Sequence, residues 1–210
     1  MPEEIVPEIY DITCRETNGR RYRAFLSVDG VPTLIDTGFE ETMDQLFAGI
    51  DEIGVDPERL IITHEHADHV EGFDAVVDNY DVETWVPETI ELDSTIDPDR
   101  RYGDGDSIGR FEAVHVPGHS PGNSALIDEQ AGIGIIADVM FGSDLRGLPP
   151  GYLILPPEIY SNDLNEAERN LSKLLKYEFD VALVYHGSSV LENAKDKIEK
   201  YVEFPGKPDS

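Results

Sequence analysis

The stretch THEHADHVEG, residues 63–72, places three histidines and an aspartate within six positions. On a regular helix, side chains two residues apart point about 200° apart, so His64 and His66 could not bind one ion there. In a loop or an extended turn they can do so. The pattern of His64, His66, Asp68 and His69 therefore predicts metal ligands that are held on a loop.

Three further candidate ligands follow apolar segments elsewhere in the chain. His119 comes after FEAVHVPG, Asp138 after GIGIIA and His186 after VALVY, much as His64 comes after LIIT. We interpret these apolar segments as strands. The sheets of α/β proteins build their sites in loops beyond the carboxyl ends of strands, so we expect these residues to converge.

The combined set of five histidines and two aspartates is large enough to hold two metal ions. Imidazole together with carboxylate suits Zn, Fe, Mn or Ni. Two divalent ions bring about four positive charges, which two carboxylates and a bound hydroxide would reduce to about one. The set therefore predicts a local Lewis-acid centre.

The elements around these residues predict an α/β protein. The segment 22–36 predicts a β-hairpin with a turn at Asp29 and Gly30, and Gly54 is expected to end a helix. Helices are predicted over residues 41–53, 163–177 and 190–203. Strands and helices alternate in both halves, and no linker-like segment separates them. We therefore expect one domain, 1–210, with a core over about 20–203.

Charge is the unusual property of the composition. The 210 residues contain 44 acids against 16 bases, for a formal net charge of −28, and the acids are spread from Glu3 to Asp209. Such self-repulsion destabilises a compact chain unless salt screens it. We interpret the charge as adaptation to a high-salt cytoplasm. It also argues against a nucleic-acid partner, because phosphate binding depends on clustered Lys and Arg.

The compartment is predicted from the single cysteine and from the apolar segments. Cys14 excludes an internal disulfide and a Cys-rich zinc module, and it fits a reducing cytoplasm. No window reaches the length of a membrane span, and the acidic start MPEEIVPEIY has no signal-peptide pattern. We expect a cytoplasmic protein without a membrane partner.

Five motifs resemble those of the metallo-β-lactamase superfamily. THEHADH resembles its H-x-H-x-D-H motif, and LIDTG, VPGHSPG, IIAD and YHGSSV resemble the others in the same order. The resemblance extends from about residue 20 to 203. It implies an α/β fold, a four-layer αββα sandwich, with the metals at one edge of the two sheets.

The resemblance also implies how the ligands are divided between two metals. The first metal would be bound by His64, His66 and His119. The second metal would be bound by Asp68, His69 and His186. Asp138 would bridge the two ions, and Asp36 would brace the metal loop through hydrogen bonds. Zinc is the expected metal, with iron and manganese as alternatives.

The implied activity is that of a dinuclear hydrolase similar to the glyoxalase II branch. A metal-bound hydroxide, oriented by Asp68, would attack an ester, thioester or lactone carbonyl of a small molecule. Enzymes of that branch carry an additional C-terminal helical region for glutathione. Only 24 residues follow His186, which disfavours glutathione thioesters.

Two other functions stay open. A mononuclear iron oxygenase similar to persulfide dioxygenases would need two histidines and a carboxylate, which His64, His119 and Asp138 could supply. That group carries a glycine-arginine-threonine-aspartate stretch after the aspartate, whereas this chain reads MFGSDLRGLPP. The other alternative is a metal-binding protein without catalytic activity.

Substrate contacts are predicted in the segment that follows Asp138. Arg146, Tyr152 and Tyr160 are candidates, with surface ion pairing or ordinary packing as the alternatives. His115 lies inside the strand FEAVHV, so we expect a core or pocket residue there and not a ligand. Loops of this kind often pack at dimer interfaces, which leaves a homodimer as an alternative to a monomer.

The net charge leads to the first prediction. Raising KCl to about 1 M shortens the screening length to about 3 Å, so it should increase the melting temperature of the protein. Circular dichroism during heating, at low and at high KCl, measures the shift. A fold that is equally stable at low salt would contradict the proposed salt adaptation.

Overall fold

The computed structural model describes residues 1–17 and 20–204. The end of the domain predicted at residue 210 lies outside these residues. The chain divides into two compact units, Met1–Tyr102 (unit 1) and Gly103–Ser210 (unit 2), and each unit is described by itself. Across the described ranges, no helix is both long and apolar enough to span a bilayer.

Unit 1 is built on a seven-stranded sheet in which the strands follow sequence order. Its strands are β1 (Glu3–Val6), β2 (Ile9–Thr17), β3 (Arg20–Ser27), β4 (Thr33–Ile35), β5 (Arg59–Ile61), β6 (Glu83–Pro87) and β7 (Arg100–Tyr102). Strands β1 to β4 are antiparallel neighbours, and β4 to β7 are parallel. The β3–β4 pairing confirms the predicted hairpin.

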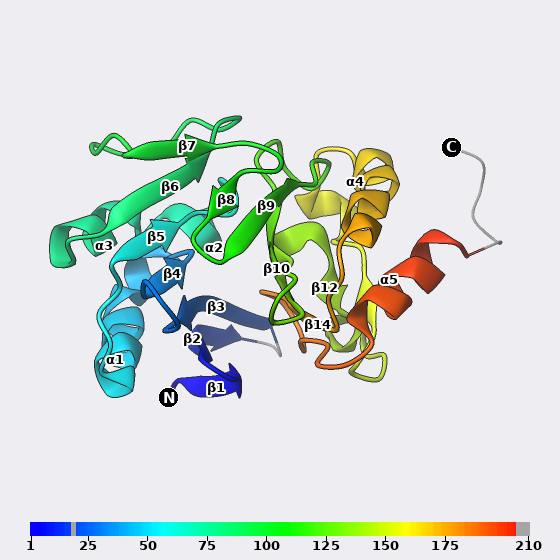
Figure 1. Ribbon diagram of the computed structural model, residues 1–210, viewed down its shortest axis with the longest axis horizontal. Coiled ribbons are helices and arrows are strands. Elements are labelled where there is room, and N and C mark those ends of the chain that lie inside the picture. The colour runs from blue at the N-terminus through cyan, green and yellow to red at the C-terminus, as the bar shows by residue number, and fades with distance from the viewer. Residues whose placement is uncertain (18–19, 205–210) are drawn as a thin grey trace. The chain divides into compact units, whose positions relative to one another are not determined.

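Helices cover one face of this sheet. They are η1 (Glu40–Thr42), α1 (Met43–Ile53), α2 (Ala67–Val70) and α3 (Phe73–Asn79). Leu46 of α1 and Phe73 of α3 share one buried cluster with Leu34 and Leu60 of the sheet, and Figure 1 shows both helices beside these strands. Gly54 ends α1 in the left-handed conformation with φ of 77°, as the sequence predicts.

Unit 2 is built on a five-stranded sheet in the order β14-β11-β10-β9-β8. Its strands are β8 (Ser107–Ile108), β9 (Phe111–His115), β10 (Ser124–Asp128), β11 (Ile133–Ile135) and β14 (Val181–Leu183). Strands β11 and β14 are parallel, and the other neighbours are antiparallel. A separate hairpin pairs β12 (Phe141–Gly142) with β13 (Leu153–Ile154).

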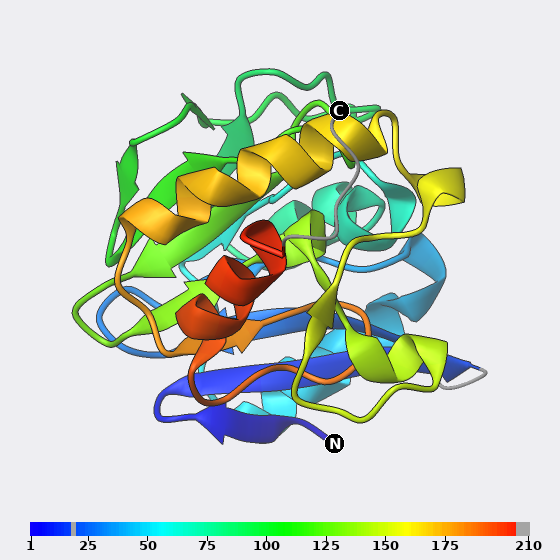
Figure 2. The ribbon, with the colours of Figure 1, turned by 90° about the vertical axis from the view of Figure 1, so that its right-hand side faces the viewer.

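The helical segments of unit 2 are η2 (Ala137–Val139), η3 (Ser143–Arg146), η4 (Glu158–Tyr160), α4 (Leu164–Asn170), η5 (Leu171–Lys176) and α5 (Ala194–Val202). Of these, η5 and α5 pack on one face of the sheet. Leu171 and Leu174 of η5 and Ile198 of α5 share a buried cluster with Val114 and Ala125 of the strands. Figure 2 shows α4, η5 and α5 in front of this sheet.

The helix predicted from residue 190 begins only at Ala194, so this boundary was wrong. Val190 instead forms an isolated antiparallel bridge with Ala182, with N–H to O distances of 2.7 and 2.9 Å in the two directions. Asn193 then takes a left-handed conformation with φ of 55°. Strand pairing and a turn therefore occupy the first residues of the predicted helix.

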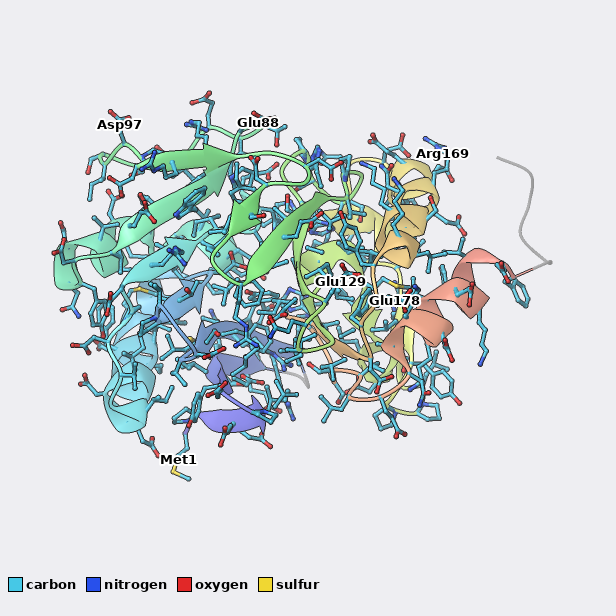
Figure 3. The ribbon with its side chains drawn as sticks, viewed as in Figure 1. Met1, Glu88, Asp97, Glu129, Arg169 and Glu178 are labelled. Atoms are coloured by element: carbon cyan, nitrogen blue, oxygen red, sulfur yellow. The ribbon has the colours of Figure 1, made fainter. Side chains whose placement is uncertain are left out.

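Most acids lie on the surface, and Asp11 is one of the few that are buried. Figure 3 shows Glu88 and Asp97 projecting outward from unit 1. In the sheet of unit 1, however, Asp11 accepts a hydrogen bond of 2.7 Å from the Nη1 atom of Arg23, and both side chains are buried. Burial of these charges is tolerated because each one pairs with the other.

Burial raises the pKa of the Cys14 thiol from 9.0 to about 12, and the nearby charge of Asp11 adds to the shift. The thiolate is the reactive form, so this cysteine should be inert in the folded protein. We expect a disulfide reagent at pH 8 to react about 100-fold more slowly with native than with denatured protein. Rapid labelling of Cys14 without denaturant would contradict this expectation.

Candidate metal centre

The carboxylate of Asp36 braces the loop that follows β5. Strands β4 and β5 are parallel, so they end at the same edge, and the Asp36 N–H donates to the Ile61 carbonyl at 2.9 Å. Oδ1 of Asp36 accepts the Thr63 N–H, and Oδ2 accepts the Thr63 hydroxyl, both at 2.7 Å. Asp36 is fully buried and has φ of 59°, a strained conformation that the surrounding bonds maintain.

Asp36 also sets the orientation of two candidate ligands. The Nδ1 atom of His69 lies 2.7 Å from Oδ2 of Asp36, where its N–H donates to the carboxylate. The Nδ1 atom of His64 lies 3.1 Å from the Thr63 hydroxyl, which already donates its own proton to Asp36. Both contacts place the proton on Nδ1, so the lone pair that can bind a metal is on Nε2.

Thr37 holds His69 from its main-chain side. The N–H and the hydroxyl of Thr37 donate to the His69 carbonyl at 2.8 and 3.0 Å, and the Gly72 N–H donates to the Thr37 hydroxyl at 3.1 Å. The LIDTG motif therefore fixes both the ring and the backbone of His69.

The histidine-rich stretch forms a compact group that we call the unit 1 cluster (His64, His66, Asp68 and His69). The ring centroids of His64 and His66 are 4.9 Å apart, and those of His64 and His69 are 4.0 Å apart. His64 and His66 lie in a loop, as predicted, whereas Asp68 and His69 belong to the short helix α2. Nε2 of His69 lies 3.8 Å from Oδ2 of Asp68.

A second group, the unit 2 cluster, consists of His119, Asp138 and His186. Oδ2 of Asp138 lies 3.3 Å from Nε2 of His119 and 3.4 Å from Nε2 of His186. All three side chains are buried. One carboxylate oxygen is thus placed between two imidazole nitrogens.

The strand directions of unit 2 explain this convergence. Strand β11 is parallel to β14, and β9 runs in the same direction because both β9 and β11 are antiparallel to β10. Each member of the cluster follows its strand by three or four residues. Ala137, just before Asp138, has φ of 47°, which is strained for a residue with a side chain.

The loop that carries His119 is fixed by close contact with the start of α4. A Cβ atom at Gly118, where φ is 128°, would lie 2.1 Å from the Ala167 nitrogen, so only glycine fits. The Asn162 N–H donates to the His119 carbonyl at 3.0 Å. Nδ1 of His119 lies 3.3 Å from the Ser161 hydroxyl, which donates to the Pro157 carbonyl.

Several residues that support the clusters were not predicted from the sequence. They are Thr37, Thr63, Phe141 and Ser161. The Phe141 ring lies against His186, with centroids 4.7 Å apart, and 6.2 Å from the His119 ring. The supporting role of Thr63 could have been predicted, because this residue directly precedes His64. The contact of Ser161 joins residues 42 positions apart and has no local signal.

The other predicted residues have different surroundings. Arg146, Tyr152 and Tyr160 are exposed in unit 2, which is compatible with substrate contact, so their role stays a prediction. His115 is half-buried at the end of β9, where its Nε2 lies 2.7 Å from the Pro121 carbonyl. Of the core or pocket residue that we expected, the half-burial excludes only the core, and His115 belongs to neither cluster.

The donor atoms of both clusters suit divalent metal ions. They are imidazole nitrogens and carboxylate oxygens, the ligands that zinc and iron use in proteins. Three of the histidines, His64, His69 and His119, have Nδ1 in contact with a hydroxyl or a carboxylate. Hydrogen bonding of the second ring nitrogen is typical of metal-binding histidines.

Similarity to known proteins shows the family to which this α/β chain belongs. A sequence model described as "Metallo-beta-lactamase superfamily" matches residues 25–186, a stretch that includes Asp36 and every member of both clusters. The chain therefore belongs to the metallo-beta-lactamase superfamily. The metallo-beta-lactamase from Pontibacter korlensis has a similar fold, with a TM-score of 0.76, 18% identity and 96% of each chain covered.

Two relatives are named as hydrolases. The "Hydroxyacylglutathione hydrolase" of Chelativorans sp. (strain BNC1) is 29% identical over 191 residues, which are 89% of this chain and 68% of that protein. The "Hydroxyacylglutathione hydrolase GloC" of Haemophilus influenzae is 28% identical over 131 residues. That match covers 51% of this chain and 60% of the Haemophilus protein.

The bracing role of Asp36 can be tested without metal. Asp36→Ala removes the acceptor of the buried Thr63 N–H and hydroxyl and of His69, so it should lower the free energy of unfolding by about 3 kcal/mol. Urea unfolding with a chelator present measures this change. Asp78→Ala, at an exposed position of α3, is the control and should change stability by less than about 0.5 kcal/mol. Equal effects of the two substitutions would contradict the role of Asp36.

Proposed function

We propose that this protein is a metal-dependent hydrolase and that the two clusters together hold two divalent ions. The observation that carries the proposal is the position of Asp138, whose Oδ2 lies 3.3 and 3.4 Å from the Nε2 atoms of two histidines. A carboxylate in this position can be shared by two ions. The family match extends through both units, and two relatives are named as hydrolases, which supports the same function.

The ligands would be divided between two ions as the family motifs imply. His64, His66 and His119 would bind one ion, and Asp68, His69 and His186 would bind the other, with Asp138 between them. We propose zinc, because a site of imidazole and carboxylate without thiolate suits zinc, with iron or manganese as alternatives. Such ions supply Lewis-acid activation of water and of a carbonyl oxygen.

The chain's own side chains would direct the reaction. We assign to Asp68 the orientation of the attacking water, because its carboxylate remains 17% exposed while the neighbouring His69 is fully buried. A carboxylate there can accept a hydrogen bond from the water and hold its line of attack on the carbonyl. Asp36 and Thr63 would keep the imidazoles of His64 and His69 in one orientation throughout.

The segment 143–162 is our candidate for the substrate-binding surface. Near its start, the Gly142 N–H donates to the His186 carbonyl, and near its end the Asn162 N–H donates to the His119 carbonyl. Residues 147–157 carry no charge, although the whole chain is strongly acidic. We propose that Tyr152 and Tyr160 contact an uncharged acyl group of an ester, thioester or lactone, and that Arg146 meets an anionic group where the substrate has one.

Several properties of the whole protein belong to the same proposal. We propose that the two units act as one domain, because the family match is continuous through both. The net charge of −28 supports a protein that works in a high-salt cytoplasm, with a small-molecule substrate and without a nucleic-acid partner. A homodimer stays an alternative to a monomer.

The test is elemental analysis of protein purified without chelator in high salt, followed by assays with esters, thioesters and lactones. We expect about two ions per chain, together with hydrolysis of at least one of these classes. Asp68→Asn should lower kcat about 100-fold with a smaller change in KM, because it weakens the orientation of the water. His115→Ala, outside both clusters, is the control and should retain both ions and full activity.

Other results would reject the proposal in different ways. About one iron per chain, with oxygen uptake in the presence of persulfides, would favour the mononuclear oxygenase. Two ions without hydrolysis of any substrate class would favour a metal-binding protein without catalytic activity. An unchanged rate in the Asp68→Asn variant would remove the role assigned to Asp68.

A further inference from the structure

The carboxylate of Asp144, in η3, forms a two-point contact with the loop that carries His186. Oδ1 accepts the Ser188 N–H at 2.8 Å, and Oδ2 accepts the Ser188 hydroxyl at 2.8 Å. Ser188 follows His186 by two residues, so the position of the one restricts the position of the other. Neither Asp144 nor Ser188 belongs to the predicted ligands.

The backbone around this contact leaves no room for a side chain at Gly142 or Gly187. The Gly142 N–H donates to the His186 carbonyl at 2.8 Å. A Cβ atom at Gly142 would lie 2.4 Å from the Ser188 nitrogen, and one at Gly187, where φ is 81°, would lie 2.9 Å from Oδ1 of Asp144. Two glycines therefore let the main chains touch, and the Asp144 carboxylate approaches the space that a side chain at Gly187 would need.

Unit 1 contains the same arrangement beside its own cluster. Asp36 accepts the N–H and the hydroxyl of Thr63, the residue before His64, as Asp144 accepts those of Ser188. In both units a carboxylate, with one oxygen for each donor, holds a hydroxyl residue close in sequence to a candidate ligand. The arrangement in unit 2 thus has the form expected for bracing a ligand loop.

We propose that Asp144 is a positioning residue that fixes His186 for binding of the second metal ion. This inference rests on the function proposed above. Asp144 acts through Ser188 and Gly187 on the backbone of His186, and Phe141 packs against the ring. The short segment 138–144 then carries both the candidate bridging ligand, Asp138, and the residue that positions His186, Asp144.

The proposal predicts weaker binding of only one of the two ions, whereas a general loss of stability would weaken the binding of both. In the Asp144→Ala variant, the ion that needs His186 should bind about 10- to 100-fold more weakly, and the other ion should bind as in the wild type. Asp144→Asn keeps the shape and one carbonyl acceptor, so it should restore most of the affinity. Competition between the protein and a zinc-binding dye measures both affinities.

The chain offers a matched control for this experiment. Asp99 accepts the N–H and the hydroxyl of Thr84 at 2.9 and 2.8 Å, which is the same chemistry, in a part of unit 1 without predicted ligands. Asp99→Ala should therefore leave both zinc affinities unchanged. Ser188→Ala removes one of the two contacts of Asp144 and should weaken the same ion about fivefold, which provides a second test if Asp144→Ala does not fold.

The possible outcomes distinguish the two proposals. Two zinc ions in the wild type, with one selectively weakened in Asp144→Ala or Ser188→Ala, would support the positioning role. Two ions with unchanged affinities in those variants, or equal weakening of both ions, would overturn that role and leave the hydrolase proposal intact. A wild-type chain that binds none of zinc, iron and manganese would overturn the hydrolase proposal and this inference with it.

Discussion

A parallel strand pair in each unit fixes where the histidines and carboxylates can lie. The pairs β4–β5 and β11–β14 bring two carboxyl ends to one edge, and from that edge the next few residues cannot diverge far. In unit 1 this places Asp36 beside Thr63, and in unit 2 it places Asp138 beside His186. The ring orientations of His64 and His69 then follow from Asp36 and Thr63, whereas the position of His119 follows from β9 and the close contact at Gly118.

Buried charge then determines which neighbours the clusters need. A carboxylate out of water is stable only with hydrogen bonds or a counter-charge. The oxygens of Asp36 receive three donor groups from Thr63 and His69, while Asp138 faces two imidazoles. The strained backbone at Asp36 and Ala137 occurs at these same places. Strain of this kind is typical of functional sites, where the surrounding contacts hold a residue in an unfavourable conformation.

Much of this arrangement could be predicted from the sequence. The parts that could not be predicted depend on contacts that leave no local pattern. The apolar runs that precede His64, His119, Asp138 and His186 predicted four strands and the loops after them. They could be predicted because the hydrophobicity of a strand is visible in consecutive residues of the sequence. Strands β1 and β2 were not predicted, and in β2 the charged residue Asp11 occupies a buried position that only its pairing with Arg23 of β3 makes acceptable. Likewise, nothing near Ser188 indicates a partner 44 residues away. Contacts between distant polar residues leave no periodic pattern in the chain.

The proposed substrate-binding segment, residues 143–162, is fixed at its two ends and exposed in part of its middle. Backbone hydrogen bonds next to His186 and His119 secure its two ends, while Leu148 and Tyr152 in the middle are exposed to solvent. Lengthening a surface loop whose ends are already fixed costs little entropy. New sequences inserted between those ends would therefore leave the buried histidines in place, and under the function proposed above they would change which molecules are recognised. On that proposal, the same scaffold would acquire new substrates, during evolution or by design, through this one stretch of chain.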